Sequence, residues 1–413
     1  MEKPATPNNR YDVVIIGAGP AGTSAAALLH RAGQDVAIFE RDEFPRFVIG
    51  ESLLPHSMDF LEQAGLLECC KKQNYLEKHG GAFFDQEKHC KFNFDDQFTD
   101  GWPYTWQVPR DHFDNVLAEE VQKMGVPVFF QHTVKDVQVG SNPTVEVTGA
   151  DGQVHRISSR FIIDASGYGR VLPRQLGLDE PSTLTHRKSV FTHITGDHRP
   201  AGRDEGTTWI VSLGQQAWLW IIPFSNGRTS IGVVGDSDFF ADLPTEPGEI
   251  LRKAIMSDPV AARRLSDMEF VFEPKVIDGY SIGIKRLWGE GYCLIGNTME
   301  FLDPIFSSGV TVALASANLA ANALIRQLNG ETVDWDADFS DVVNQGVETF
   351  RTYVEGWYTG AVPTVFYSPN PDARVRASIC SVLAGYVWDN KNPYAWDHKR
   401  KLPQLVDLVQ SGV

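Results

Sequence analysis

The sequence predicts a mixed α/β fold, in which a Rossmann-like βαβ unit is interleaved with an antiparallel β-sheet and followed by C-terminal helices. Residues 10–40 have the pattern of a buried strand, a glycine turn, an Ala/Leu-rich helix and a second strand. Residues 181–273 are rich in Thr, Val, Ile and Trp, which is typical of longer antiparallel strands. From Asp336 onward, apolar side chains recur at helical spacing. The 413 residues suffice for two or three structural units with a large core.

The glycine turn has the features of a dinucleotide-binding loop. Gly17 permits the tight turn, Gly19 lets backbone N–H groups approach a pyrophosphate, and Gly22 lets the next helix pack closely on the strand. Glu40 ends the second strand about 20 residues further on, where an acidic side chain accepts hydrogen bonds from a ribose. We therefore expect a bound dinucleotide. Its predicted contacts in this unit are Gly17, Gly19, Pro20, Ala21, Gly22 and Glu40.

Three regions share the chain. We predict a nucleotide-binding domain over residues 1–78, 104–180 and 274–335, a substrate-side sheet domain over 79–103 and 181–273, and a C-terminal helical region over 336–413. The first domain is expected to contain a helix from Arg110 to Met124 and a small antiparallel meander over 133–159. In the C-terminal region, one apolar helix stripe is predicted at Phe350, Tyr353, Val354, Trp357 and Tyr358.

Composition narrows the classes of partner. A net charge of −16 argues against nucleic acid and anionic membranes, and it makes a strongly acidic carrier protein a less natural partner. Residues 1–10 are polar and lack a secretory segment, and no apolar run approaches the length of a membrane span. We therefore expect a soluble, cytoplasmic protein. The five cysteines show no CxxC spacing, and the histidines show no metal-binding pattern, so we expect reduced thiols and no metal site.

Further motifs follow the glycine turn in a characteristic order. They are Pro45–Pro55, Arg110 with Phe113-Asp114, Asp164–Gly167, Trp218-Leu219-Trp220-Ile221-Ile222-Pro223 and Phe301–Gly309. This order resembles that of the FAD-dependent monooxygenase-like flavoproteins, and the tryptophan segment is similar to the W-x-W-x-I-P signature of flavin-dependent halogenases. Geranylgeranyl reductases share the early motifs. The resemblance implies a p-hydroxybenzoate-hydroxylase-like fold. It also implies further FAD contacts, at Arg41, Arg46, Gly50, Glu51, Ser52, Arg110, Asp164, Gly167, Asn297, Pro304, Gly309 and Val310.

The resemblance to halogenases also implies a reaction. Reduced FAD, O₂ and a halide, chloride or bromide, give hypohalous acid, which travels through the protein to a lysine beside an electron-rich aromatic substrate. Lys78 is the implied lysine, because the segment from Glu77 to Phe84 matches the family's K-x-G-A-x-F surroundings apart from one extra position. Burial among aromatic rings would lower the pKa of Lys78 toward that role. The alternative interpretation is a solvated surface lysine, close in sequence to Lys71 and Lys72.

The tryptophans and the loop before Gly309 carry the other implied roles. Trp218 and Trp220 are two positions apart on a strand and share one face. If that face looks toward the flavin, the indoles would keep an organic substrate away from it, whereas core packing is the alternative. Ser307, Ser308 and Gly309 lead into a helix and supply backbone amides at its positive end, where a halide would bind. The same amides would serve the flavin in an enzyme without a halide.

Other features concern the supply of flavin and the substrate. Asn297 stands where many relatives carry an aspartate, and an amide suits looser binding of a diffusible reduced FAD. No second glycine-rich nucleotide motif is present, so we expect a separate flavin reductase. The chain is shorter than the tryptophan-specific halogenases and looks closer to phenol- and pyrrole-acting members, so the expected substrate is a small aromatic molecule, free or carrier-tethered. The alternatives are a hydroxylase or a double-bond reductase without halide chemistry, and a flavoprotein without turnover.

Overall fold

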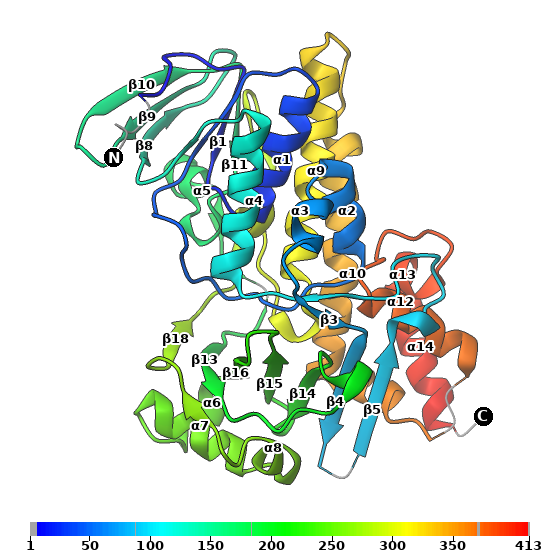
Figure 1. Cartoon of the computed structure of the whole chain (residues 1–413). Coiled ribbons are helices and arrows are strands. Elements are labelled where there is room, and N and C mark those ends of the chain that lie inside the picture. Colours follow the sequence, from blue (N-terminus) through cyan, green and yellow to red (C-terminus); the bar gives the residue numbers. More distant parts are fainter. Residues whose placement is uncertain (1–5, 87, 183, 370–371, 412–413) are drawn as a thin grey trace.

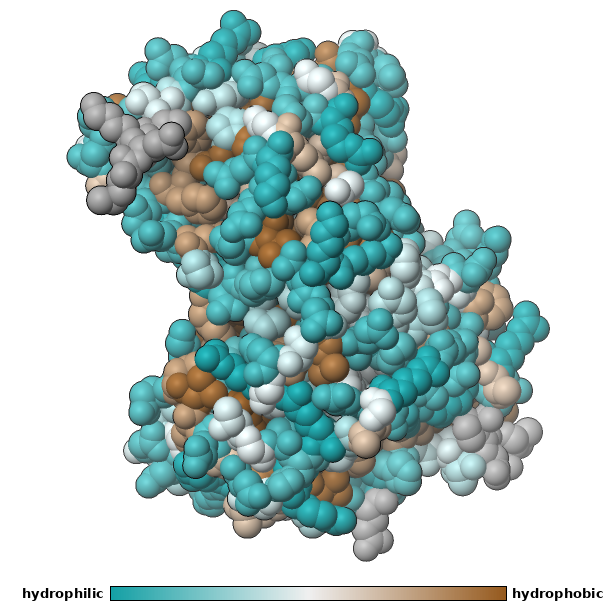
Figure 2. Space-filling model, viewed as in Figure 1, coloured by the Kyte–Doolittle hydropathy of each residue, from teal (hydrophilic) through white to brown (hydrophobic). Residues whose placement is uncertain are grey.

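The structure, a computed structural model, describes residues 6–86, 88–182, 184–369 and 372–411. It has two lobes, and the C-terminal helices lie beside the second of them (Figure 1). The outline narrows to a waist between the lobes (Figure 2). Residues 1–5, which begin the polar segment predicted to lack a secretory sequence, lie outside the described residues, as do 412–413.

The first lobe is built on a six-stranded sheet that carries the predicted βαβ unit. From one edge to the other, its strands are β20 (Trp288–Gly289), β21 (Tyr292–Leu294), β11 (Phe161–Asp164), β1 (Val13–Ile16), β2 (Val36–Phe39) and β7 (Val128–Phe129). β1 is parallel to both neighbours, with Val14 opposite Ile162 and Ala37. Every residue of β1, β2 and β11 is buried, as expected of a parallel sheet covered on both faces.

Helices and a small sheet surround this core. The helices are α1 (Pro20–Arg31), α2 (His56–Ala64), α3 (Leu67–Lys71), α4 (Arg110–Met124), α5 (Val171–Leu176) and α9 (Gly309–Leu328). α4 has the bounds that the sequence predicts. The predicted meander forms β8 (Thr133–Gln138), β9 (Thr144–Thr148) and β10 (Val154–Ser158), which lie at one end of the lobe (Figure 1).

Among the described residues, α9 alone has the length and mean hydropathy of a membrane span. However, 72% of the apolar window is buried inside the protein. α9 packs against α1, α2 and α10 (Asp341–Tyr358), and alanines dominate its buried surface. This arrangement is that of a helix in a protein core.

The second lobe is built on a larger sheet. Its strands, in spatial order, are β17 (Glu269–Phe270), β13 (Lys188–Thr195), β16 (Thr229–Gly235), β15 (Ala217–Pro223), β14 (Thr208–Ser212), β4 (Gly80–Asp85) and β5 (Lys88–Asn93), and β18 (Lys275–Asp278) also pairs with β13. β14 and β4 run parallel, whereas the sequence predicted an antiparallel sheet. The chain between β4 and β14 passes through the first lobe, so no hairpin fixes an antiparallel direction for this pair.

Side chains of β15 alternate between two separate cores. Leu219 and Ile221 pack in a cluster with the helices α6 (Ser237–Ala241), α7 (Pro247–Met256) and α8 (Pro259–Arg264). Trp218, Trp220 and Ile222 belong instead to the main core, on the face toward the first lobe. The predicted shared face of the two tryptophans is therefore present. The period of two residues along the strand produces this division.

Short elements and helices complete the fold. β3 (Leu76–Lys78) pairs with β6 (Thr105–Gln107), and β12 (Asp179–Glu180) with β19 (Gly283–Ile284). The C-terminal region contains α10, α11 (Ala361–Phe366), α12 (Ala373–Leu383), α13 (Pro393–Trp396) and α14 (His398–Gln410). The predicted stripe lies on α10, where Phe350, Tyr353, Val354 and Trp357 are buried and Tyr358 is partly buried. All five cysteines are free and buried, as predicted.

The glycine turn generates a first prediction. A Cβ on Gly22 would lie 2.0 Å from the carbonyl oxygen of Gly17, so the backbone of the turn would have to move. We expect Gly22→Ala to destabilise the protein without added ligand by about 1–3 kcal/mol, measured by thermal unfolding. Gly19→Ala is the control, because the nearest atom to its Cβ is a flexible Arg46 nitrogen 3.7 Å away. Equal stability of both variants would contradict the expected close packing of α1 on β1.

Candidate functional site

A cavity of about 480 Å³ lies between the two lobes. The glycine turn, the segment around Gly50, the start of α9 and the inner face of the second sheet line it. Most of the predicted site residues lie in its wall: Gly17, Gly19, Pro20, Ala21, Glu40, Arg41, Arg46, Gly50, Glu51, Ser52, Arg110, Gly167, Trp218, Trp220, Asn297, Pro304, Ser307, Gly309 and Val310. Four others, Gly22, Lys78, Asp164 and Ser308, lie behind the wall.

The helix α1 begins at the cavity with free backbone donors. Pro20 is its first residue, no side chain caps the first turn, and no acidic residue lies in that turn. Gly17 has a φ of +101°, a conformation that favours glycine. The unsatisfied N–H groups and the helix dipole together make this end suitable for a phosphate group.

Glu40 lies in the cavity wall, but backbone amides already engage its carboxylate. Its two oxygens accept hydrogen bonds from the amides of Ala18, at 2.8 Å, and Asp42, at 3.0 Å. Each carboxylate oxygen retains a further acceptor position, which a ribose hydroxyl could occupy. Nearby, Arg46 forms an ion pair with buried Asp114 at 2.9 Å. The wall around the glycine turn thus contains both an acidic acceptor and a cation.

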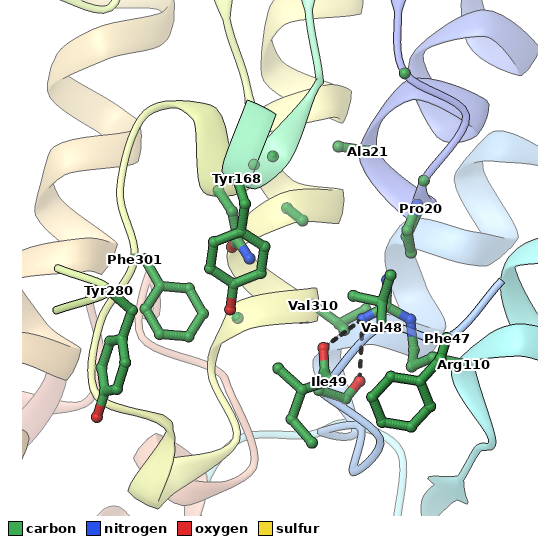
Figure 3. Close-up of a pocket in the computed structure, with 18 of the residues that line it drawn as sticks. Pro20, Ala21, Phe47, Val48, Ile49, Arg110, Tyr168, Tyr280, Phe301 and Val310 are labelled. Carbon is green, nitrogen blue, oxygen red and sulfur yellow. Dashed lines mark hydrogen bonds between the residues drawn. The ribbon is translucent and has the colours of Figure 1, made fainter. Parts of the chain in front are cut away.

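Arg110 fixes the loop that forms one side of the cavity. Its guanidinium makes a bidentate ion pair with Asp114, with N–O distances of 2.7 and 3.0 Å. Its Nη1 also donates to the carbonyl oxygens of Ile49 and Gly50, at 3.2 Å each (Figure 3). Tyr168 lies across the cavity from this loop (Figure 3). Arg110 is buried and therefore acts mainly by holding the loop in place.

Asp164 supports the site from outside the cavity. Its carboxylate accepts hydrogen bonds from the amides of Ser166, at 2.9 Å, and Leu172, at 2.7 Å. Burial raises the pKa of Asp164, and these hydrogen bonds oppose that rise. The carboxylate therefore holds the turn in which Gly167 reaches the cavity wall beside Asn297.

The start of α9 presents backbone groups to the cavity. Ser307, Gly309 and Val310 line the wall, whereas the side chain of Ser308 is buried beside it. Ser307 has a φ of +58°, which turns the chain sharply before the helix begins. No acidic residue lies in the first turn of α9, so the positive end of the helix dipole faces the cavity uncompensated by side chains of that turn.

A buried network connects the tryptophans to the C-terminal helices. The two indole rings are 5.9 Å apart, between centroids, and both side chains are almost fully buried. Trp218 Nε1 donates to the hydroxyl of Tyr358 at 2.8 Å, and that hydroxyl donates to Asp303 Oδ2 at 2.8 Å. Trp220 Nε1 donates to Ser230 Oγ at 3.0 Å. Both indole N–H groups are therefore satisfied, which holds the rings against the cavity.

A second buried pair joins the cavity wall to the second sheet. His193 Nε2 lies 2.7 Å from Glu51 Oε1, and both side chains are buried. Glu51 Oε2 is buried without a hydrogen-bond partner among the described residues. The histidine ring also contacts Phe47, Phe224 and Phe272. The pair fixes Glu51 where the segment around it passes between the lobes.

Lys78 is buried, with only 3% of its surface exposed, so the surface-lysine interpretation is wrong. Its Nζ donates to Ser52 Oγ at 2.8 Å and to the carbonyl oxygen of Leu53 at 2.9 Å, and it lies 5.7 Å from the centre of the Phe94 ring. No carboxylate of the described residues lies within ion-pair distance of this Nζ. Burial lowers the pKa of Lys78 to about 7.

Sequence reasoning missed the partners of these residues. His193, Thr208, Asp303 and Tyr358 all take part in the networks around the cavity, yet the partners that join them there are 55 or more positions away. Asp303 lies within the Phe301–Gly309 motif, but no short motif marks the other three residues, because pairing of distant strands and helices brings them together. Tyr358 stands at the end of the predicted apolar stripe, and a hydroxyl on that stripe is the signal that could have identified it.

Comparison with known proteins gives a matching family and relatives that agree with it. The FAD binding domain family matches residues 10–247. A 1H-pyrrole-2-carbonyl-[peptidyl-carrier protein] brominase of Pseudoalteromonas luteoviolacea is 30% identical, over 92% of this chain and 93% of that protein. The corresponding chlorinase of Pseudomonas fluorescens is 28% identical, over 96% of this chain and 94% of that protein.

Solved structures agree with these relatives. A flavoprotein/dehydrogenase from Cytophaga hutchinsonii is 45% identical with a TM-score of 0.95, covering 98% of this chain and 99% of that chain. The flavin-dependent brominase Bmp2 is 26% identical with a TM-score of 0.85, covering 98% of this chain and all of that chain. The likeness to these structures includes both lobes and the C-terminal helices.

The network at Trp218 generates a second prediction. Tyr358→Phe leaves the buried indole N–H without its acceptor, so we expect a loss of about 1–3 kcal/mol in unfolding free energy and a shifted tryptophan fluorescence. Tyr367→Phe is the matched control, because the Tyr367 hydroxyl is buried without a partner among the described residues. Unchanged stability in Tyr358→Phe, or an equal loss in the control, would show that this hydrogen bond does not hold Trp218.

Proposed function

The chain belongs to the flavin-dependent halogenases and is an FAD-dependent oxidoreductase, and on that premise we propose that it halogenates an electron-rich aromatic ring by way of Lys78. The observation that carries this proposal is the position of the Lys78 amine. It is buried without a counter-ion, one hydrogen bond behind the wall of the cavity that the dinucleotide-binding turn lines. A lysine with only a structural role would be expected to pair with a carboxylate there.

The cavity suits FAD on physical grounds. The N-terminus of α1 offers free amides to a pyrophosphate, and the face of Gly19 toward the cavity has no backbone atom within 4 Å of a Cβ position. Arg41 and Arg46 add positive charge at the same end, and Glu40 offers carboxylate oxygens to a ribose. When bound, reduced FAD supplies, together with O₂, the oxidising equivalents that convert a halide into hypohalous acid.

The first turn of α9 is the proposed halide site. Gly309 and Val310 line the cavity where the helix begins, and the turn contains no acidic side chain that would repel an anion. Backbone amides at a helix N-terminus bind chloride or bromide through oriented N–H dipoles. Asn297 offers an amide, not a carboxylate, beside this turn, so it adds no negative charge there.

The two tryptophans separate the aromatic substrate from the flavin. Trp218 and Trp220 occupy the wall of the second lobe, and hydrogen bonds to Tyr358 and Ser230 hold them. Two large rings held in that wall stand between the cavity and a substrate on the other side of them. The oxidant that leaves the cavity is therefore a small inorganic molecule, and direct hydroxylation of the ring is suppressed.

Lys78 is suited to act as a neutral amine. A neutral amine has two N–H groups and a lone pair, and the two acceptors at Ser52 and Leu53 engage two N–H groups. An ammonium would carry a third N–H into a buried site, at a cost of about 1–3 kcal/mol if unsatisfied. The lone pair is then available to bind the electrophilic halogen of hypohalous acid beside the substrate.

The source of reduced flavin and the location of the enzyme complete the proposal. A separate flavin reductase delivers reduced FAD, and the reaction takes place in the cytoplasm, where reduced nicotinamide cofactors are available to such a reductase. The carrier-protein brominase and chlorinase named above act on a pyrrole joined to a carrier protein, whereas this chain is strongly acidic. A free phenol or pyrrole and a carrier-tethered pyrrole are therefore compared directly in the experiment.

The proposal predicts the effect of removing the lysine. With reduced FAD from an added reductase, O₂, bromide or chloride, and a panel of phenols, indoles, pyrroles and carrier-tethered pyrrole, we expect a product with a halogen isotope pattern in its mass spectrum. Lys78→Ala should lower halogenation by more than about 100-fold while flavin reoxidation continues. Lys72→Ala, which removes an exposed lysine, is the control. A halide-independent hydroxylated product would indicate a hydroxylase instead.

The pH dependence is a separate prediction. Because burial lowers the pKa of Lys78 to about 7, the fraction of neutral amine rises as the pH increases through about 7. Halogenation per flavin oxidised should therefore rise over the same interval and level off above it. Lys78→Arg, which stays charged, should remain inactive throughout. Halogenation that falls as the pH rises through this interval would contradict a neutral amine.

A further inference from the structure

Ser52 and Thr208 lie between the cavity and Lys78. Both residues line the cavity, and Ser52 Oγ lies 3.0 Å from Thr208 Oγ1. On the other side, Ser52 Oγ accepts the hydrogen bond from Lys78 Nζ. Ser52 belongs to the segment before α2, whereas Thr208 begins β14, so the two hydroxyls meet where the lobes join. The pair therefore joins the cavity wall directly to the amine through the hydrogen bond from Lys78 to Ser52.

The hydrogen bonds of the pair leave one hydroxyl proton free. Ser52 Oγ accepts from Lys78, and Thr208 Oγ1 accepts from Gln107 Nε2 at 2.7 Å. Two hydroxyls carry two protons, and the bond between them uses only one. The second proton has no acceptor among the described residues, so one hydroxyl has a donor to offer a small polar molecule at the cavity wall.

On the side of the second sheet, this pair is polar and its neighbours in the wall are apolar. Its neighbours in the cavity include Ile210, Trp220 and Ile222, which offer no acceptor or donor toward it. On the side of Lys78, Thr105 and Gln107 each keep a buried oxygen without a partner among the described residues. Such atoms on strand β6, which pairs with the strand of Lys78, are sites where a small polar molecule would gain hydrogen bonds.

We propose that the Ser52–Thr208 hydroxyl pair is the point at which hypohalous acid passes from the flavin cavity to Lys78, and that Thr208 and Ser52 position it there by hydrogen bonding. The inference rests on the proposed role of Lys78 and adds two positioning residues to it. Both hydroxyls are on short side chains, which rotate between staggered positions without movement of the backbone. The two hydroxyls can therefore reorient around a triatomic molecule such as hypohalous acid while the backbone stays in place.

Thr208→Val tests the passage because it removes the hydroxyl and keeps the shape. We expect about tenfold less halogenated product per flavin oxidised, a difference of about 1.4 kcal/mol, with more free hypohalous acid captured by an added thiol. We call the amount of halogenated product per flavin oxidised the coupling. Thr208→Ser, which keeps the hydroxyl, should restore this coupling to within about twofold of the wild-type protein. Ser52→Ala should lose coupling like Thr208→Val, which guards against a defect specific to one variant.

A second experiment, which needs no flavin, tests the same passage by the rate at which a small reagent reaches Lys78. Isocyanic acid is a small polar electrophile that adds across its C=N bond to a neutral amine, giving a carbamoyl-lysine with no leaving group. We expect carbamoylation of Lys78 in the flavin-free protein, measured by peptide mass spectrometry, to slow at least about fivefold in Thr208→Val and to recover in Thr208→Ser. A purely structural role of Thr208 would not slow this reaction while near-ultraviolet circular dichroism stays unchanged.

The control removes a comparable hydroxyl pair elsewhere. Ser57 Oγ lies 2.8 Å from Thr311 Oγ1, is buried, and lines no part of the cavity. Ser57→Ala should keep both coupling and carbamoylation. Normal coupling and normal carbamoylation in Thr208→Val and Ser52→Ala would overturn the passage while leaving the role of Lys78 intact. Undiminished halogenation in Lys78→Ala would instead overturn the proposed function itself.

Discussion

The segment 49–55 determines where the two halves of the site lie, and buried side chains from three directions fix it. Arg110 of α4 binds the carbonyl oxygens of Ile49 and Gly50, His193 of β13 binds Glu51, and Lys78 of β3 binds Ser52 and Leu53. Two backbone hydrogen bonds add further restraint: the amide of Leu53 donates to the carbonyl oxygen of Trp106, and the amide of Val108 donates to that of Glu51. The segment is thus a partition with the cavity on one side and the lysine on the other.

This partition also explains why Arg110, His193 and Lys78 are all buried between the lobes. Each of the three side chains satisfies groups of an irregular segment that has no regular ladder of its own. Removing one partner would leave the others with unsatisfied buried atoms, so the contacts support one another. The C-terminal helices contribute in the same way, because Tyr358 joins Trp218 to Asp303 at the start of the α9 loop.

Local elements could be predicted from the sequence, whereas contacts between distant elements could not. The strand, turn and helix at Gly17 follow from neighbouring residues, and the shared face of Trp218 and Trp220 follows from the period of a strand. By contrast, the pairing of Glu51 with His193 joins residues 142 positions apart, and nothing in either local sequence indicates it. Asp164 binds backbone amides behind the wall, and its local sequence does not indicate those partners either. The parallel pairing of β14 and β4 was missed for the same reason, because it depends on the path of the chain through the other lobe.

The division of β15 between two cores has a practical consequence. Leu219 and Ile221 face the helices of the outer cluster, and Trp218, Trp220 and Ile222 face the cavity. Neighbouring positions of this strand therefore contribute alternately to the outer core and to the cavity wall. Protein engineers could raise heat tolerance by repacking the outward positions and alter product selectivity at the inward ones, because the thickness of a single sheet keeps the two sets of changes apart.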